Sequence, residues 1–151
     1  MAELPELDSV VAHNTKVTGA SFPKFKTWPR WRIVYLRGGD SPSCRELLPA
    51  LKNNPALQEL ALNMAWTDDD LAHMATNKEL QSLAIDSGKA ITNRGLAYLS
   101  GLTKLRLLDI QGCQATDDGI DHLLGLKDLE HFAIPKNVTD MVADQFACSP
   151  S

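Results

Sequence analysis

The chain has 151 residues, a formal net charge of −4 and a hydrophobic content of 44%, which is enough to build a buried core. It contains no unbroken apolar run of the roughly 18 residues that a membrane span needs, and its acidic balance argues against general nucleic-acid binding. Its first residues, MAELPELDSV, lack the basic and apolar parts of a signal peptide, and its three cysteines are widely separated without a CxxC pair. These features predict a single cytoplasmic domain without a disulfide framework.

Six short segments with the period of a strand follow one another along the chain. They start at Leu7, Trp31, Leu57, Leu80, Leu105 and Leu129, which lie 23 to 26 residues apart. Apolar residues follow each start three and five places later: Val10 and Ala12, Val34 and Leu36, Leu60 and Leu62, Leu83 and Ile85, Leu108 and Ile110, Phe132 and Ile134. This alternation is typical of a strand with one face turned inward.

A short helix is predicted after each of the first five strands, except that Pro23 and Pro29 leave a 3₁₀ turn or an extended loop equally open after the first. Apolar residues recur nine and six places before the next strand start: Phe22 and Phe25, Leu48 and Leu51, Leu71 and Met74, Leu96 and Leu99, Ile120 and Leu123. Spacing by three places them on one side of a helix. The first two repeats and the last are less regular and are expected to cap the stack.

Helix boundaries are also marked in the sequence. Thr67–Asp68, Thr92–Asn93, Thr116–Asp117 and Thr139–Asp140 are expected helix starts, because these side chains accept N–H groups of a first turn. Asn77, Gly101 and Gly125 are expected to end helices, because each of these residue types tolerates a positive φ.

The repeated pattern LxxLxLxxCxxxTDxGLxxLxxL resembles the leucine-rich-repeat family, closest to its cysteine-containing subclass. The resemblance is sharpest over residues 80–128, and Cys113 occupies the cysteine position. It implies an α/β solenoid of about six repeats over residues 1–151, with a curved parallel sheet on the concave face and short helices on the convex face. It also implies a protein-interaction module.

Residues 9–39 hold six basic residues, no acidic residue and five aromatic residues. Basic residues interleaved with aromatic ones are typical of nucleic-acid binding. The repeat register instead assigns Phe22, Phe25, Trp28 and Trp31 to the core, and only Tyr35 to an outward position. The basic groups therefore predict a patch for an acidic surface rather than for nucleic acid.

Metal and catalytic sites are not expected. Asp68, Asp69, Asp70 and Glu79 have part of the spacing of a calcium loop, but His73 stands where that loop needs glycine, so helix capping explains the aspartates better. Cys113 is expected to be buried and to serve packing. The sequence contains neither a G-x-S-x-G elbow nor a glycine-rich phosphate loop. We therefore expect no cofactor and no enzymatic activity.

With the register fixed, the outward strand positions form three columns. The first column is Ser9, Ile33, Glu59, Ser82, Leu107 and His131; the second is Val11, Tyr35, Ala61, Ala84, Asp109 and Ala133; the third is His13, Arg37, Asn63, Asp86, Gln111 and Pro135. The alanines of the second column predict the smooth floor of a groove with Tyr35 as an anchor, whereas the alternative interpretation is an ordinary solvated sheet. The expected partner-binding residues are Ile33, Tyr35, Arg37, Glu59, Ala61, Asn63, Ala84, Asp86, Leu107, Asp109 and Gln111.

The sequence thus predicts a non-catalytic protein–protein interaction module that binds a protein or peptide on its concave face. The alternative is a structural or assembly subunit that docks through its helical side, its ends or its basic N-terminal patch. An enzyme is the least favoured class. We expect no nucleic-acid or membrane partner, and a monomer with weak, salt-sensitive self-association.

Overall fold

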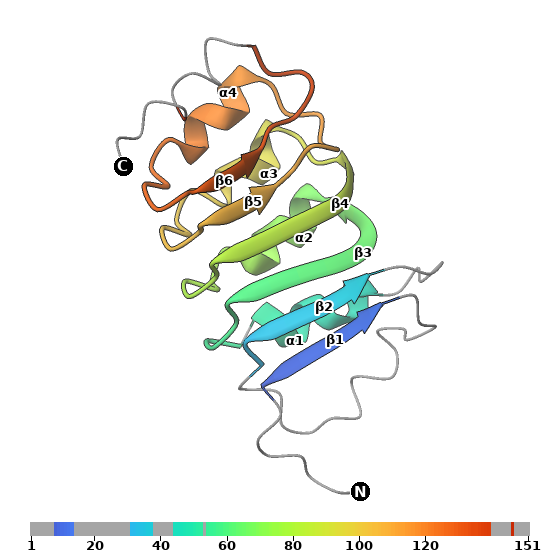
Figure 1. The fold of residues 1–151 in the computed structure, drawn as a ribbon. Helices are drawn as coiled ribbons and strands as arrows, with labels where there is room; N and C mark the ends of the chain where they lie inside the picture. The colour runs from blue at the N-terminus through green and yellow to red at the C-terminus, as the bar shows by residue number, and fades with distance from the viewer. Residues whose placement is uncertain (1–7, 14–30, 38–43, 53, 140–145, 147–151) are drawn as a thin grey trace, which may run out of the picture.

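The computed structural model describes residues 8–13, 31–37, 44–52, 54–139 and 146. These residues form one sheet of six parallel strands in the order β1-β2-β3-β4-β5-β6. The strands are β1 (Ser9–His13), β2 (Ile33–Arg37), β3 (Glu59–Thr67), β4 (Ser82–Ala90), β5 (Leu107–Asp109) and β6 (His131–Ala133). Each strand lies beside the next one in sequence, so the chain advances by one strand per repeat (Figure 1).

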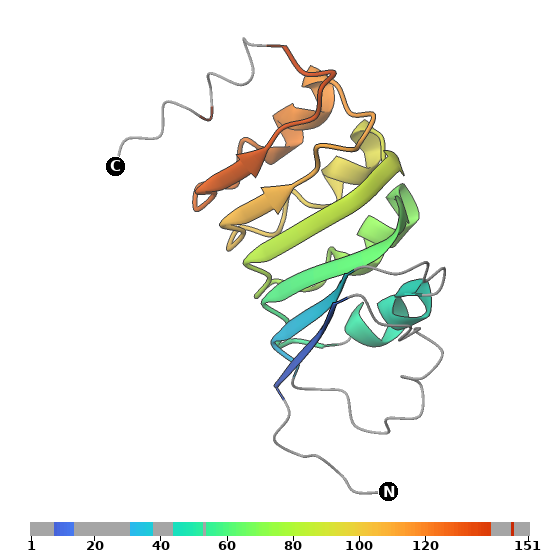
Figure 2. The same cartoon turned by 45° about the vertical axis from the view of Figure 1, so that its right-hand side comes forward.

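The helices cover one face of this sheet, as two views of the ribbon show (Figures 1 and 2). They are η2 (Cys44–Leu47), α1 (Leu48–Lys52), α2 (Asp68–Met74), α3 (Asn93–Ala97), α4 (Asp117–Ile120) and η3 (Asp121–Leu123). Each is only one or two turns long, which is too short to be stable alone in water. Their stability comes from packing against the sheet and against the helices of neighbouring repeats.

The core lies between the strands and the helices, where the sequence predicted it. The inward residues of β2 to β5 and the apolar residues of the helices are at most 4% exposed: Val34, Leu36, Leu60, Leu62, Leu83, Ile85, Leu108, Leu48, Leu51, Leu71, Met74, Leu96, Leu99, Ile120 and Leu123. Trp31 is buried as expected, at 6% exposure. Phe22, Phe25 and Trp28 lie outside the described residues.

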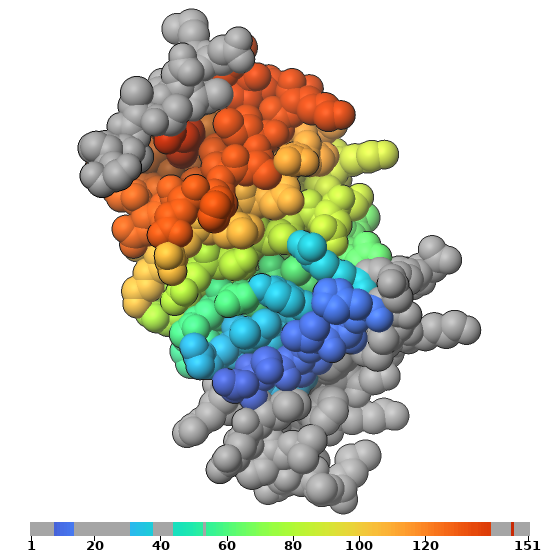
Figure 3. Space-filling model, in the orientation of Figure 1, coloured from blue at the N-terminus to red at the C-terminus, as the bar shows by residue number. Residues whose placement is uncertain are grey.

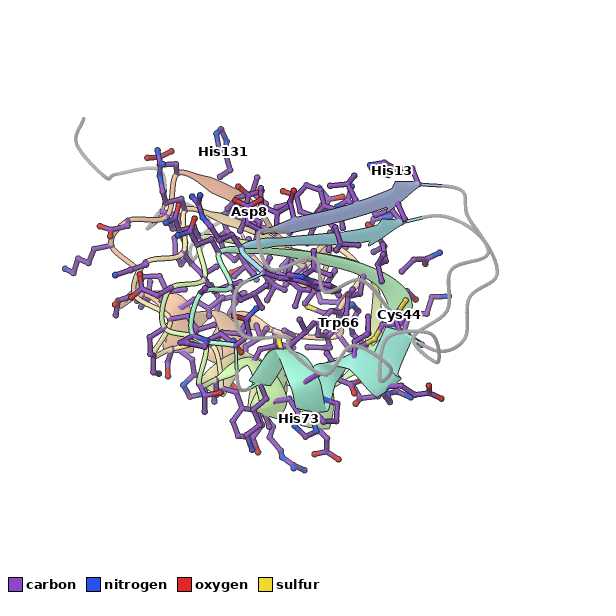
Figure 4. All side chains as sticks on the ribbon, turned by 90° about the horizontal axis from the view of Figure 1, so that it is seen from below. Asp8, His13, Cys44, Trp66, His73 and His131 are labelled. Carbon is purple, nitrogen blue, oxygen red and sulfur yellow. The ribbon has the colours of Figure 1, made fainter. Side chains whose placement is uncertain are left out.

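Viewed from below the stack, the strands form one layer and the helices the other, with Trp66 between them (Figure 4). Trp66 is fully buried, and its indole Nε1 donates a hydrogen bond to the carbonyl oxygen of Leu62 at 3.2 Å. This partner satisfies the one polar group of the ring, which allows so large a side chain to fill the core.

The strand register confirms two of the three predicted outward columns. The paired residues run Ser9, Ile33, Glu59, Ser82, Leu107 and His131 in one column, and Val11, Tyr35, Ala61, Ala84, Asp109 and Ala133 in the next. Of the third column, the strand pairing includes only His13 with Arg37, although Asp86 still lies on the same face, since it forms an ion pair with Arg37. Gln111 and Pro135 follow the ends of β5 and β6, and Pro135 is buried.

β3 and β4 depart from the simple repeat, because each has nine residues. Their register shifts after the pair Leu62 and Ile85, and a second paired segment follows at Ala65 with Ser87 and at Thr67 with Ala90. A shift of this kind is a bulge, which bends a strand and re-aims its side chains. It breaks the third column at Asn63.

The helix starts bind the neighbouring repeat, and Thr92 but not Thr116 also accepts an N–H group of its own helix. The Asp68 carboxylate accepts hydrogen bonds from the backbone N–H and hydroxyl of Thr92, at 2.8 and 2.7 Å. The Asn93 amide oxygen accepts from the backbone N–H of Thr116 at 2.9 Å, and its NH₂ group donates to the Thr116 hydroxyl at 3.0 Å. Asp117 accepts both bonds from Thr139, which lower the pKa of its carboxyl group. The Thr-Asp/Asn pairs therefore form a ladder that joins successive repeats.

Glycine follows two of these pairs because the ladder needs the space. A Cβ atom added to Gly95 would lie 2.3 Å from Oδ1 of Asp68, and one added to Gly119 would lie 2.5 Å from Oδ1 of Asn93. In α2, the position that corresponds to Gly95 and Gly119 holds Asp70. Asp70 faces Arg45, which lies 23 residues before Asp68. The guanidinium of Arg45 donates to both oxygens of Asp70 at 2.9 Å.

Asp70 also closes the capping box of α2. Its carboxylate accepts from the Thr67 backbone N–H and hydroxyl, each at 2.8 Å, and Thr67 in turn accepts from the Asp70 N–H. The predicted helix start at Thr67–Asp68 is thus confirmed. Burial tends to raise the pKa of Asp70, but the bonds from Arg45 and Thr67 outweigh it and hold that pKa below its usual value.

The helix ends do not work as the sequence predicted. Neither Gly101 nor Gly125 has a positive φ, and the residue that ends α2, Ala75, has a φ of −55°. Asn77 is buried, and its amide donates to the carbonyl oxygens of Leu51 at 2.8 Å and Asn54 at 2.9 Å. Its role is to bond the preceding repeat rather than to turn the chain.

Candidate protein-binding face

Within the described ranges, helices cover only one face of the sheet, and we call the opposite face the outer sheet face. It carries the two confirmed columns together with His13, Arg37, Asn63 and Asp86. Figure 3 shows the strands crossing this face as successive bands from β1 to β6. All eleven expected partner-binding residues except Gln111 lie on strands, and Gln111 lies in the turn after β5.

Tyr35 on β2 bonds to the neighbouring strands. Its phenol donates a hydrogen bond to the Glu59 carboxylate of β3 and also interacts with the Ser82 hydroxyl of β4. Burial raises the pKa of the phenol, and the hydrogen bond and negative charge of Glu59 raise it further. Tyr35 therefore stays protonated as a donor at neutral pH and leans over β3.

Arg37, also on β2, reaches in the same direction. Its guanidinium lies 3.7 Å from the Asp86 carboxylate on β4, and both side chains are about two-fifths exposed, at 41% and 38%. Since β3 lies between β2 and β4, this ion pair spans the middle strand. Tyr35 and Arg37 thus cross β3 side by side.

These two side chains change the predicted groove. Ala61 and Ala84 point to the outer face, yet they are only 1% and 6% exposed. The expectation of an open floor was therefore wrong, because side chains from β2 span the strand that carries Ala61. Only small side chains fit at these positions, because the long side chains of Tyr35 and Arg37 lie across the sheet there.

Apolar side chains remain open at the N-terminal end of the outer sheet face. Val11 is 54% exposed, and its register partner is Tyr35. Ile33 on β2 is half-buried although it has no place in the core between the layers, and the same is true of Leu107 on β5, toward the other end of this face. Exposed apolar groups near one another are typical of interaction surfaces.

The acidic residues lie toward the other end. Asp109 of β5 is half-buried and accepts a hydrogen bond from the Gln111 backbone N–H at 3.3 Å. Its register neighbours on β4 and β6 are Ala84 and Ala133, which are both small. The charge on this face therefore runs from Arg37 at β2 to Asp86 and Asp109 at β4 and β5.

The remaining reactive residue types are dispersed or buried. His13 and His131 project from the sheet side and His73 from the helical side (Figure 4). Among the described residues, no group of three or more histidines, cysteines, aspartates and glutamates is placed to hold a metal ion. Cys113 is 3% exposed, which confirms its expected burial, and that burial raises the pKa of its thiol. No helix in the part of the chain that the structure describes is long and apolar enough to cross a bilayer.

The comparisons with known proteins agree with this architecture. No protein-family model and no curated protein sequence matches the chain. Among solved structures, internalin C2 (inlC2) from Listeria monocytogenes str. 4b F2365 is similar over 95% of this chain and 67% of its own, with a TM-score of 0.64 and 19% sequence identity. The chain therefore has the α/β leucine-rich-repeat solenoid fold that the repeat predicted.

Proposed function

We propose that the chain is a non-catalytic module that binds a protein or peptide partner on its outer sheet face. The observation that carries this proposal is the set of apolar side chains on that face, led by Val11 at 54% exposure. Core packing does not explain them, since the inward residues of the same strands fill the core. The in-register columns also place them beside polar groups, which is the usual make-up of a protein-binding surface.

The alternative is a structural or assembly subunit that docks through its helical side, its ends or its basic patch. One described residue favours the helical side: Leu124, which follows η3, is 41% exposed. Four of the basic residues of the patch, Lys16, Lys24, Lys26 and Arg30, lie outside the described residues. On the outer sheet face the exposed Val11 is joined by the half-buried Ile33 and Leu107, and so we favour that face.

Further parts of the assignment are also proposals. We infer that residues 1–151 form one domain of the cysteine-containing subclass, supported by the buried Cys113 in the turn after β5. We also infer a cytoplasmic location, supported by the free, buried thiol of Cys113. The partner is expected to be neither nucleic acid nor membrane, and no cofactor is expected.

A matched pair of substitutions tests the binding face. Leu107→Arg places a long cation on the outer sheet face, and Leu124→Arg makes the same change on the helical side. Partners captured by the wild-type chain, identified by mass spectrometry, should be lost with Leu107→Arg and kept with Leu124→Arg. Tyr35→Ala should weaken the same binding by more than about 1 kcal/mol. Circular dichroism must show that each variant is folded, and the reverse pattern would support the alternative.

A further inference from the structure

The ion pair between Arg37 and Asp86 on the outer sheet face is loose. Its atoms are 3.7 Å apart, the same distance as in the pair Arg32 and Asp8, whereas Arg94 and Asp69 approach to 2.9 Å and Arg106 and Glu130 to 2.7 Å. A long, half-exposed pair of this kind contributes little stability, about 0–1 kcal/mol. Asp86 can therefore exchange Arg37 for a cation from a partner at small cost.

Asp109 supplies a second carboxylate on the neighbouring strand. Its register partner on β4 is Ala84, two residues before Asp86, so the two aspartates are diagonal neighbours on the same face. Leu107 lies two residues before Asp109 on β5, and Ala133 beside Asp109 leaves space. An apolar side chain next to a carboxylate suits lysine or arginine, whose aliphatic stem packs while its charged end is paired.

The apolar side chains that are open to solvent on β1 and β2 lie at a fixed distance from Asp86 and Asp109. Val11, Ile33 and Tyr35 belong to β1 and β2, and Tyr35 shares a column with Asp109 three strands away. Neighbouring strands are about 4.8 Å apart, so this distance is about 14 Å, which an extended peptide crosses in about four residues.

From these placements, and resting on the proposed function, we propose that the partner presents an extended segment that lies across the strands. A lysine or arginine of that segment pairs with Asp86 and Asp109, and an apolar residue about four positions away packs on Val11, Ile33 and Tyr35. In the free protein, Arg37 occupies the place of the partner's cation at Asp86. The segment approaches with its basic end over β4 and β5, because Arg37 and its positive charge lie at β2.

Peptide display against the full-length chain tests this inference without knowledge of the natural partner. The probes are random peptides of about ten residues, enough to cross the six strands. Enriched peptides should carry lysine or arginine about four positions from an apolar residue, and their binding should fall with added salt. Asp86→Asn together with Asp109→Asn should weaken their binding at least about tenfold, whereas Arg37→Gln should strengthen it by releasing Asp86. Asp118→Asn together with Asp121→Asn, on the helical side, is the matched control and should leave binding unchanged.

The outcomes separate this inference from the function on which it rests. Peptides that lose binding to Leu107→Arg but bind the Asp86/Asp109 double variant normally would leave the outer sheet face as the binding site and overturn the basic-segment inference. Enrichment of acidic peptides would overturn it too. A selection that yields no peptide sensitive to Leu107→Arg would overturn both.

Discussion

At the scale of single residues, Asp70 shows how this fold tolerates a buried charge. The residue is 3% exposed, yet each carboxylate oxygen is bonded to Arg45 or Thr67. Removing one partner from such a set leaves the other buried without compensation, which costs more than the set contributes as a whole. Its neighbours Asp68 and Asp69 instead bond to Thr92 and Arg94 of the next repeat.

We expect Asp70→Asn to lower the free energy of unfolding by about 1–3 kcal/mol at neutral pH. Because the folded pKa of Asp70 lies below its usual 3.8, its stabilisation is present above that value and is lost as the pH falls through the folded pKa. Urea unfolding from pH 7 to pH 2.5 should show the gap between wild type and variant closing below about pH 4. Asp118→Asn, an exposed control, should change stability by less than about 0.5 kcal/mol at every pH. A gap that stays constant with pH would contradict this role.

At the scale of elements, strand–turn–helix units are joined by side chains as well as by the sheet. The Thr-Asp/Asn ladder joins helix starts about 24 residues apart, and Gly95 and Gly119 leave room for the preceding repeat's acceptor. A glycine inside a short helix normally weakens it by about 1 kcal/mol relative to alanine. Here the close contact of Gly95 and Gly119 with the preceding repeat outweighs the preference of a helix for alanine.

Gly95→Ala is expected to destabilise the protein by about 1–3 kcal/mol, because the new methyl group meets the Asp68 carboxylate. The same substitution at Gly125 meets no atom within 4 Å and should change stability by less than about 0.5 kcal/mol. Thermal melts of Gly95→Ala, Asp68→Ala and the double variant should give a coupling of at least about 1 kcal/mol. Additive effects would show that the two residues do not meet.

Much of this element-scale structure was accessible from the sequence, and the rest was not for identifiable reasons. Columns of apolar residues such as Leu60, Leu83 and Leu108 predicted the core and register, because both follow from the periods of strands and helices. Thr92 and Asn93 bond to neighbouring repeats because of which side chains meet in space. A capping rule, which considers only residues close in sequence, does not contain this information. The bulge after Leu62 broke the third column without a residue type that marks it.

The candidate site was predicted less well than the fold. Register reasoning placed Tyr35, Arg37, Glu59 and Asp86 on the correct face. It did not predict that Tyr35 would bond to Glu59 or that Arg37 would reach Asp86 across an intervening strand. Such pairs depend on side-chain length and direction as well as on period. For the same reason the burial of Ala61 and Ala84 was missed.

At the scale of the whole molecule, each repeat is stabilised mainly by its neighbours, so damage in the middle of the stack affects both sides. Leu108 is fully buried, and its strand, β5, lies between β4 and β6. Leu108→Asp should cost several kcal/mol, enough to unfold a marginally stable domain. Asp121→Ala, at an exposed position on the helical side, should leave the melting temperature nearly unchanged. Equal effects in thermal melts would contradict the register.

Self-association also belongs to this scale. The basic first part of the chain and the acidic remainder should attract one another from head to tail, while the irregular first and last repeats, which are expected to cap the stack, would limit such stacking. We therefore expect a monomer at low concentration and weak association at high concentration that fades as salt is added. Light scattering over a salt series measures this, and a dimer insensitive to salt would contradict it.

The ladder also determines where the solenoid can grow. The block from Asn93 to Thr116 begins with the side chain that binds Thr116 and carries Gly95 two residues after its start. This block can be duplicated in tandem, because the second copy places Gly95 against the first Asn93, where Gly119 lies in the protein. The block from Asp68 to Thr92 cannot, because a second copy places Asp70 against the first Asp68, where Gly95 leaves the space. The block that begins at Arg45 cannot be duplicated either, since Arg45 needs Asp70 opposite it. Lengthening by gene duplication or by design is thus open at residues 93–116 and closed at Asp68 and at Arg45.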